Sequence, residues 1–525
     1  MKKEKTDILI IGAGASGAAS AWNLSNLKLK ITCLEQGPFL DKEEYSFNNI
    51  NREINKFKKF NINPNERNFV SDYAIDCKNS PISIANYNAI GGSTLVYSGH
   101  YPRFHPSDFK TKKLDNIGSN WLFNYYDLEK YYDLNDKIVK VSGLTGDPAY
   151  PKINNLLPPL DIGYSGNLLA KAFNKLGWHW WPSYAAVRSS KKFSKGLRPT
   201  AVEMYLNKAI KNGVKVKSNC RVIKIKVSKK NIATGVIYFD KNNSKKFLEA
   251  KIILLGANGI GTPRILLNSA NKNFPKGLAN SSNQVGRNLM LHPLGYVEGN
   301  YNSFLASDEG PEGCAIYSHE FYETKKNRDF KRGYTIQLLK SPGPIETFNY
   351  LKKFNKIRFG KTFFKNLFNH YGCTIPLAII CEDTPNKNNY VELDFQNLDS
   401  NKMPGIKVNY KLSNNSKKML SHGINKCKIL LKTSGAKNIR AFGPVRNTGW
   451  HLVGTAKMGK TRKDSVVNKF GQCHDVKNIF IIDSSTFPSS SGVNIASTVQ
   501  AVSLMISDTI KKNIKNLLNN EFRIK

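Results

Sequence analysis

Short apolar runs that lead directly into glycine-rich turns are the most regular feature of the chain. Ile8 to Ile11 form such a run before Gly12-Ala13-Gly14-Ala15-Ser16-Gly17, and an Ala-rich stretch of helical character follows at 18–27. A second apolar run at 31–34 ends at Glu35. Uninterrupted apolar runs of this length are typical of parallel strands that are buried on both faces. The order strand, glycine turn, helix, strand and acid predicts a dinucleotide-binding βαβ unit.

Two later segments repeat this pattern. The run 252–255 enters a glycine-rich segment at 256–263, where Pro263 suits the first turn of a following helix. The run 479–482 ends at Asp483, and a last helix is predicted for 499–510. Parallel strands bring their carboxyl ends to one edge of a sheet, so Asp483 is expected close to the dinucleotide.

Apolar and polar residues alternate between these runs. The alternation over 214–249 predicts antiparallel strands, and it returns in four segments further on, at 334–338, 374–381, 390–393 and 406–410. These four segments predict an antiparallel sheet in a second domain that is inserted into the first. We expect the dinucleotide-binding domain over 1–296 with excursions around 40–80 and 100–200, the inserted domain over 297–440, and a return to the first domain over 441–525.

Several segments carry less specific patterns. Residues 40–76 are polar and mixed, which indicates a surface excursion with at most one helix. The helix predicted at 125–141 has an aromatic stripe that is typical of a packed core. The tryptophans 178, 180 and 181 indicate either a pocket wall or packing between domains. The segment 348–371 mixes aromatic residues with basic ones, which favours a solvated helix at a domain edge over a helix that lies on a membrane.

Composition narrows the class of protein. The chain has 525 residues, of which 40% are hydrophobic, so it is long enough to bury a large core. Its longest apolar runs, such as 375–380, are too short to cross a bilayer, and the first strand begins too early to leave room for a signal peptide. The eight cysteines form no CxxC pair and no metal-ligand spacing. We therefore expect reduced thiols, no metal site and a cytoplasmic protein.

The net charge of +40 is the most unusual bulk property. Attraction to a membrane, a nucleic acid or an acidic substrate is one interpretation. The basic residues are spread along the whole chain instead of being concentrated in one arm or helix, which favours a compositional bias with lysine as the default surface residue. We expect no nucleic-acid partner, and a peripheral membrane contact stays as the alternative.

The glycine turns have a direct physical meaning. Gly12 permits a tight turn, Gly14 lets the backbone approach a pyrophosphate, and Gly17 lets the helix pack close to the strand. Glu35 is placed to accept hydrogen bonds from a ribose diol, which argues against a 2′-phosphate but leaves NAD and FAD open. A second loop at 88–99 is low in charge and rich in Gly, Ser and Thr, which suits close approach to a planar ring or a phosphate.

Seven segments of the chain, taken together and in this order, resemble the glucose–methanol–choline (GMC) family of flavoprotein oxidoreductases. The resemblance covers nearly the whole chain, and residues 120–143 further resemble the branch of gluconate and fructose dehydrogenases. The implied fold is α/β, with a Rossmann-like FAD-binding domain and an inserted α+β substrate domain built on an antiparallel sheet. The segments that carry the resemblance are the first glycine turn with Glu35, Gly91-Gly92-Ser93-Thr94-Leu95-Val96, 256–263, 285–293, 382–385, 451–459 and 483–494.

The resemblance implies FAD as the cofactor and assigns residues to it. Gly12, Gly14 and Gly17 would lie at the pyrophosphate, and Glu35 at the adenosine ribose. The loop 91–96 would lie beside the flavin and Asp483 beside the ribityl–pyrophosphate region, while the backbone of Val222 would contact the adenine. The expected cofactor-binding residues are Gly12, Gly14, Ala15, Ser16, Gly17, Glu35, Gly91, Gly92, Ser93, Thr94, Val96, Val222, Ala257, Asp483, Asn494 and Ile495.

His451 and Asn494 fall on the paired active-site positions of the family. Oxidation of an alcohol removes the hydroxyl proton and a hydride from the adjacent carbon, and a neutral imidazole is suited to accept that proton, a step typically worth ~10²–10⁴ in rate. Asn494 is expected to donate a hydrogen bond to the developing alkoxide, and the flavin to take the hydride. His292 is interpreted as a structural histidine near a domain junction, and Tyr97 as a candidate for the pocket wall.

Departures from the family pattern refine these expectations. Val96 stands where several members carry a histidine that tethers FAD, which predicts non-covalent FAD. Residues 190–195 lack the cysteine cluster of some relatives and no CxxCH haem site occurs, so electrons are expected to pass to oxygen or to a separate acceptor. We expect an alcohol, sugar or polyol as substrate. A flavin-containing lyase on the same fold and a basic surface-associated protein with a structural flavin are the alternatives.

Overall fold

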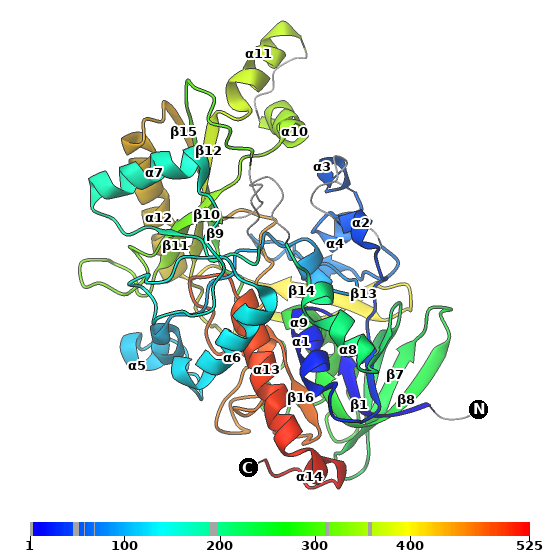
Figure 1. Cartoon of the computed structure of the whole chain (residues 1–525). Coiled ribbons are helices and arrows are strands. Elements are labelled where there is room, and N and C mark those ends of the chain that lie inside the picture. The colour runs from blue at the N-terminus through cyan, green and yellow to red at the C-terminus, as the bar shows by residue number, and fades with distance from the viewer. Residues whose placement is uncertain are drawn as a thin grey trace.

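The computed structural model describes residues 4–45, 52–56, 58–67, 69–187, 198–309, 314–354 and 360–524. A parallel set of strands in the order β5-β2-β1-β8, with β16 paired to β8, forms the main sheet, in the lower right part of Figure 1. In such an order the connections diverge between β1 and β8, and ligands bind there beyond the carboxyl ends of the strands. The strands are β1 (Glu4–Ile11), β2 (Ile31–Leu34), β5 (Lys215–Lys217), β8 (Lys245–Leu255) and β16 (Ile479–Ile481).

Strand β8 is long because its two halves have different partners. Its first half pairs antiparallel with β7 (Ala233–Phe239), which in turn pairs with β6 (Arg221–Val227). Its last three residues pair with β16. The antiparallel strands predicted within 214–249 therefore belong to the main sheet. The start of β6 lies beside the end of β2, because Cys220 N donates to Glu35 O at 2.8 Å.

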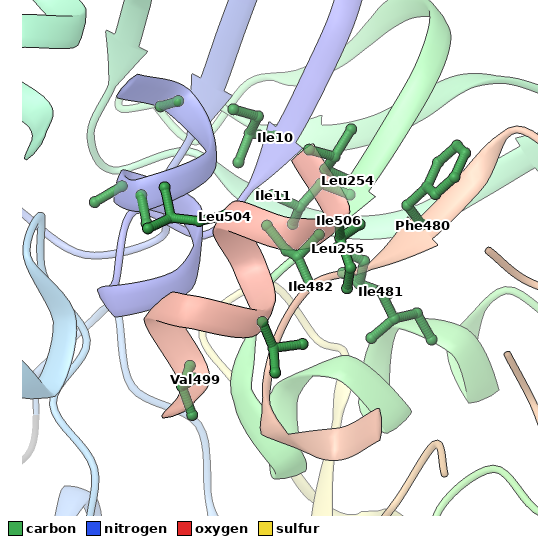
Figure 2. Packing of buried hydrophobic residues seen from close by; sticks show 14 of the residues in the cluster. Ile10, Ile11, Leu254, Leu255, Phe480, Ile481, Ile482, Val499, Leu504 and Ile506 are labelled. Carbon is green, nitrogen blue, oxygen red and sulfur yellow. The ribbon is translucent and has the colours of Figure 1, made fainter. Parts of the chain in front are cut away.

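The parallel strands are buried on both faces, as the continuous apolar runs predict. Figure 2 shows Ile10, Leu254 and Ile481 of three strands close to Leu504 and Ile506 of α13 (Ala496–Lys512). Burying a side chain of this size contributes about 1.5–3 kcal/mol relative to leaving it in water. This packing attaches the last segment of the chain to the first domain.

Helices α1 (Ala15–Leu24) and α13 lie side by side on one face of the sheet (Figure 1). Small residues line their contact. Ser503 Oγ donates to the backbone oxygen of Ser16 at 2.6 Å and lies 2.8 Å from Ser20 Oγ. The glycine turn that precedes α1 is thereby fixed by residues from the opposite end of the sequence.

A second, antiparallel sheet has the order β15-β9-β12-β11-β10-β4. Helices α7 (Gly163–Leu176) and α12 (Asn414–Thr433) pack on one of its faces. Successive side chains of a strand point to opposite faces, so the other face is free to form a cavity wall. The strands are β4 (Trp181–Pro182), β9 (Leu294–Asn300), β10 (Cys314–Ser318), β11 (Tyr334–Leu339), β12 (Thr374–Cys381) and β15 (Asn438–Phe442).

Two of the four alternating segments are not in this sheet, contrary to the sequence prediction. β13 (Tyr390–Leu398) and β14 (Pro404–Asn409) pair with each other, and β14 also pairs with β3 (Ile75–Asp76), in a separate three-stranded sheet. Alternation specifies which face of a strand is apolar but not which strand it pairs with. The domain boundaries placed after residues 296 and 440 stay predictions.

The excursion at 40–76 contains three one-turn helices among its described residues, where at most one was predicted. They are α2 (Lys42–Tyr45), α3 (Arg52–Asn55) and α4 (Pro64–Arg67). Single helical turns depend on local capping and tertiary packing, so the hydrophobic pattern carries little information about them. Further short helices are α5 (Thr111–Asp115), α8 (Asn207–Lys211) and α14 (Ile514–Leu518).

The longer helices agree better with the sequence. α6 (Tyr125–Val139) is present, and its aromatic stripe is buried in the core as predicted. α9 (Asn258–Asn268) begins before the predicted point, so Pro263 lies inside the helix instead of in its first turn. The cause is Asn258, whose Oδ1 accepts the N–H groups of Ile260 and Gly261 at 2.8 and 3.1 Å and opens the helix earlier.

The segment 348–371 contributes to two helices instead of one. α10 (Pro344–Phe354) and α11 (Lys361–His370) extend from the six-stranded sheet at the top of Figure 1. The basic residues 356 and 358 of this segment lie outside the described residues, as does the 190–195 segment. Within the described ranges, no helix is long and apolar enough to cross a membrane.

Candidate active site

One cavity of about 830 Å³ reaches from the carboxyl edge of the parallel sheet to the inner face of the six-stranded sheet. His451 and all the predicted cofactor-binding residues line it, except Gly17 and Gly91. These residues come from the first hundred, the middle and the last hundred positions of the chain. The fold therefore brings nearly the whole predicted set to one place.

The glycine turn is as tight as its pattern predicts. Gly12 has φ +97°, and a Cβ there would lie 2.4 Å from Gly256 O. A Cβ on Gly17 would lie 1.9 Å from Gly12 O, so Gly17 serves the close contact of helix and strand and lies behind the cavity wall. Gly91 also lies behind the wall, where its N–H donates to Ala13 O at 3.0 Å and joins the second loop to the first turn.

A narrow cradle forms where Gly14 and Gly92 face each other. A Cβ on Gly92 would come within 2.8 Å of Gly14 Cα. Gly14 also caps the N-terminus of α1, and no side chain there accepts the N–H groups of the first turn. The free amides and the positive end of the helix dipole suit a pyrophosphate. The backbone thus fits the phosphate part of a dinucleotide.

Glu35 lies at the end of β2 and is buried. Its Oε2 accepts the N–H of Ala13 at 2.9 Å, and its Oε1 accepts that of Gly37 at 3.0 Å. Each oxygen keeps a lone pair for a further donor, as a ribose diol requires. Burial raises the pKa of Glu35 to about 7, although these backbone N–H groups act in the opposite direction.

Asp483 lies two residues after the end of β16 and is also buried. Its carboxylate accepts a hydrogen bond from Thr262 Oγ1 of α9 at 2.6 Å and one from the N–H of Ser485 at 2.9 Å. Burial raises the pKa of its carboxyl group above the usual value. Val222 lines the cavity from the start of β6. Glu35 and Val222 therefore lie on the β2–β6 side of the cavity, and Asp483 lies on the β16 side.

The structure brings His451 and Asn494 together, as the sequence predicts. Asn494 Nδ2 lies 3.5 Å from His451 Nε2, and both residues line the cavity. Burial lowers the pKa of His451 well below its usual value, and the nearby histidines 292 and 100 act in the same direction. A neutral imidazole is the form that accepts a proton.

Two further residues contact this pair, and sequence reasoning assigned neither to the site. His292 Nδ1 lies 2.9 Å from His451 Nδ1, so the structural interpretation of His292 is incomplete. Gln337 of β11 donates from Nε2 to Asn494 Oδ1 at 2.7 Å. An amide in the middle of an otherwise mostly apolar strand was the available signal for Gln337. The adjacent His-Pro dipeptide in the 285–293 segment was the signal for His292.

The inner face of the six-stranded sheet forms a mainly apolar wall beside Gln337. On β12, Ile375, Leu377 and Ile379 pack against the helices, whereas Pro376, Ala378 and Ile380 line the cavity. Ala378 pairs with Gln337 on one side and with Tyr296 on the other, so these three side chains form a row across the sheet. Leu294, Leu339 and Trp450 add to the apolar lining. The lining elsewhere in the cavity also includes the charged residues Glu53, Lys56, Asp308, Lys340 and Glu346.

The pocket candidates from the sequence divide into two groups. Tyr97 lines the cavity, and its hydroxyl donates to Pro199 O at 2.7 Å. Trp178, Trp180 and Trp181 pack on the two hydrophobic cores and take no part in the lining. In the part of the chain that the structure describes, no group of three His, Cys, Asp or Glu side chains is arranged to hold a metal ion.

Comparison with known proteins gives consistent results at three levels. A GMC oxidoreductase family model matches residues 6–294 with its N-terminal part and residues 385–503 with its C-terminal part. The 2-methyl-1,2-propanediol dehydrogenase of Mycolicibacterium austroafricanum is 34% identical, over 98% of this chain and 97% of that protein. The fructose dehydrogenase large subunit of Gluconobacter japonicus is 25% identical over 97% of this chain and 98% of its own.

Solved structures agree on the fold. Pyridoxine 4-oxidase from Mesorbium loti superposes with a TM-score of 0.67 over 97% of this chain and 99% of its own, at 16% identity. An identity this low bears on the fold alone. The α/β architecture predicted from the sequence is confirmed.

Proposed function

Because the chain belongs to the GMC oxidoreductase family, we propose that it oxidises the CH–OH group of a small, neutral alcohol with FAD as its cofactor. The observation that supports this most directly is the position of His451 and Asn494. Their facing nitrogens lie 3.5 Å apart in the same cavity as the Gly14–Gly92 cradle. A proton acceptor and a hydrogen-bond donor thus share one cavity with a dinucleotide cradle.

The residues that would hold FAD are those of the sequence prediction. Gly12, Gly14 and the N-terminus of α1 suit the pyrophosphate, and Glu35 suits the adenosine ribose. The remaining predicted residues that line the cavity would surround the other parts of FAD. When bound, FAD supplies a ring that accepts a hydride.

FAD is proposed to bind without a covalent link. Val96, which lines the cavity, has no nucleophilic atom. Precipitation with trichloroacetic acid should therefore release all the flavin and leave a colourless pellet. Yellow colour that stays with the precipitated protein contradicts this proposal.

In the proposed reaction, His451 takes the hydroxyl proton of the substrate. Its buried, neutral imidazole carries a lone pair for this purpose. Asn494 donates a hydrogen bond from Nδ2 to the oxygen as negative charge develops on it. Gln337 holds Asn494 Oδ1 and so keeps the donor side of that amide directed at His451. Apolar side chains on the nearby wall lower the local dielectric constant, which strengthens both interactions.

The wall chemistry favours a substrate with an apolar carbon skeleton. Beside Gln337 it consists mainly of aliphatic and aromatic side chains, and Tyr296 already donates its hydroxyl to Glu298 Oε2 at 2.8 Å. A sugar would leave several hydroxyl groups without partners on such a surface. Short branched alcohols and diols fit better, and the relative from Mycolicibacterium is named for a diol of this kind.

The test is anaerobic reduction of the bound flavin by a panel of alcohols, diols and sugars. Absorbance of the oxidised flavin should bleach with small branched alcohols or diols, and far more slowly with hexoses. The His451→Ala variant should keep its yellow flavin but bleach at least ~100-fold more slowly, in line with the value of a general base. Repetition with oxygen and with artificial acceptors then identifies where the electrons go.

Two outcomes contradict the proposal. One is an absence of bleaching with every alcohol in the panel although FAD is bound, which favours a lyase on this fold. The other is a His451→Ala variant that is reduced at a near-normal rate, which removes His451 from the reaction.

A further inference from the structure

A chain of hydrogen bonds with a fixed direction runs from a backbone carbonyl to His451. His292 Nε2 lies 2.9 Å from Ser490 O, and His292 Nδ1 lies 2.9 Å from His451 Nδ1. Both imidazoles are buried, with His292 only 1% exposed and His451 8% exposed. The direction of each bond can be read from the groups involved.

The carbonyl of Ser490 settles the first bond, because a carbonyl oxygen only accepts. His292 Nε2 therefore carries a hydrogen. A neutral imidazole has one N–H and one lone pair, so the lone pair of His292 lies on Nδ1 and faces His451. Burial keeps His292 neutral by lowering its pKa to about 4. His451 Nδ1 must then be the donor of the bond between the two rings.

The same logic fixes the other nitrogen of His451. With its hydrogen on Nδ1, neutral His451 carries its lone pair on Nε2, the atom that faces Asn494 Nδ2. Gln337 donates to Asn494 Oδ1, which leaves the amide N–H₂ of Asn494 directed at this lone pair. The bonds from both sides agree on one arrangement of hydrogens.

We propose that His292 is a positioning residue that holds the proton of His451 on Nδ1 and so leaves Nε2 as the base that receives the hydroxyl proton. The inference rests on the proposed function. When the O–H bond breaks, the proton moves to Nε2 and the electron pair stays on the substrate oxygen. The resulting imidazolium keeps donating from Nδ1 to His292, now as a stronger, charge-assisted bond.

The backbone of His292 supports a dedicated role. His292 has φ +51°, in the left-handed region, although it is not a glycine and precedes Pro293. Side chains other than Gly, Asn and Asp rarely adopt this conformation, and the residue before proline favours extended backbone. Strained residues of this kind persist where the surrounding structure holds them, often at functional sites.

Three variants test the proposal. His292→Leu removes the acceptor for His451 Nδ1. His292→Gln offers an amide oxygen to His451 and an amide N–H to Ser490 O, which reproduces the direction of both bonds. His422→Leu is the matched control. His422 lies on α12, which packs on the opposite face of the six-stranded sheet, and its Nδ1 lies 2.8 Å from Tyr334 Oη.

The expected rate of flavin reduction at saturating substrate falls about 10- to 100-fold in His292→Leu. The apparent substrate affinity should change less than about threefold. His292→Gln should recover most of the rate, and His422→Leu should resemble the unchanged enzyme. Nitrogen-15 spectra of histidine-labelled holoenzyme, assigned by comparison with His451→Ala, should show Nε2 of His451 unprotonated and Nδ1 protonated.

Each part has an outcome that overturns the proposal. A protonated Nε2 on neutral His451 in the unchanged enzyme overturns it directly, even if no alcohol reduces the flavin and the proposed function fails. If alcohols do reduce the flavin, a near-normal rate in His292→Leu, or a Gln variant no faster than the Leu variant, overturns it while leaving the proposed function intact. If His292→Leu does not fold, the nitrogen-15 spectra and the rate of His292→Gln still test whether His292 has the proposed role.

Discussion

Glu35 meets two opposing demands on its charge. Burial favours the protonated form and raises its pKa to about 7, whereas a ribose diol needs an acceptor and favours the carboxylate. Cofactor binding should therefore lower this pKa. Below about pH 7 the free site must lose a proton to bind, so its affinity for FAD should fall as the pH falls.

The affinity of the apoprotein for FAD tests this linkage. Between pH 8 and pH 6 the Kd should rise by up to about tenfold for each pH unit below 7, because one proton is released on binding. Glu35→Gln should bind more weakly at pH 8 and show a much flatter profile, since Gln does not titrate. A wild-type Kd that is constant over this range contradicts the expectation.

A comparison of Gly92 with Gly177 distinguishes two effects of replacing a glycine, which are steric contact with a neighbour and strain of the backbone. Both have left-handed backbone, with φ +57° and φ +65°. A Cβ on Gly92 would meet Gly14 Cα at 2.8 Å, whereas a Cβ on Gly177 would meet nothing within 4 Å. Alanine at either position costs roughly 1–2 kcal/mol of strain, but only at Gly92 does it also push apart the cradle.

Gly92→Ala should therefore lose flavin, with at least a tenfold higher Kd for FAD, while Gly177→Ala should keep full flavin content. Reconstitution with FAD and thermal unfolding of both variants provide the comparison. Equal flavin content in the two variants would show that the cradle does not need this close approach.

At the scale of elements, successive side chains of β12 point to opposite faces of the sheet, and the two faces have different roles. Ile379 packs against the helices, and its neighbour Ala378 lines the cavity between Gln337 and Tyr296. A small side chain at 378 leaves room in the cavity beside Gln337, the residue that holds Asn494. The strand thus supplies core packing and substrate shape with alternate residues.

Valine at position 378 should change substrate selectivity, whereas valine at position 379 should change stability. Ala378→Val should lower the kcat/KM of branched alcohols about tenfold relative to ethanol, because a methyl group in a pocket typically changes selectivity by about that much. Ile379→Val should leave this ratio unchanged and lower the free energy of unfolding by ~0.5–1.5 kcal/mol. An unchanged ratio in Ala378→Val would place the substrate elsewhere in the cavity.

At the scale of the whole molecule, the net charge of +40 acts independently of the site. The protein should bind vesicles that contain anionic lipid at low salt, and neutral vesicles hardly at all. About 0.5 M salt should release it, because screening shortens the range of these charges to a few ångströms. Binding that survives high salt would instead indicate apolar insertion, with the α10–α11 extension as the first segment to test. The cytoplasmic location stays a prediction; seven of the eight cysteines have side chains that the structure describes, and these seven form no disulfide.

Much of the fold and site followed from the sequence because their signals are local. The run from Ile8 into the Gly12–Gly17 turn determines a strand, a tight turn and a helix through neighbouring residues alone. Glu35 was placed by its position at the end of the second strand, and Asp483 by the rule that parallel strands end at one edge. Each of these features is marked by residues close to it in the sequence, so hydrophobic period and glycine positions suffice to find it.

The tertiary structure decided what depends on contacts between distant residues. The pairing of β13 with β14 and β3, the bond from Gln337 to Asn494 and the contact of His292 with His451 join positions that lie up to 331 residues apart. No periodicity relates such positions, because their distance is set only when helices and sheets pack. The sequence by itself thus predicted the first glycine turn and named the proposed base. Packing decided that Gly92 faces Gly14 and that Nε2 of His451 faces Asn494, because both contacts join distant parts of the chain.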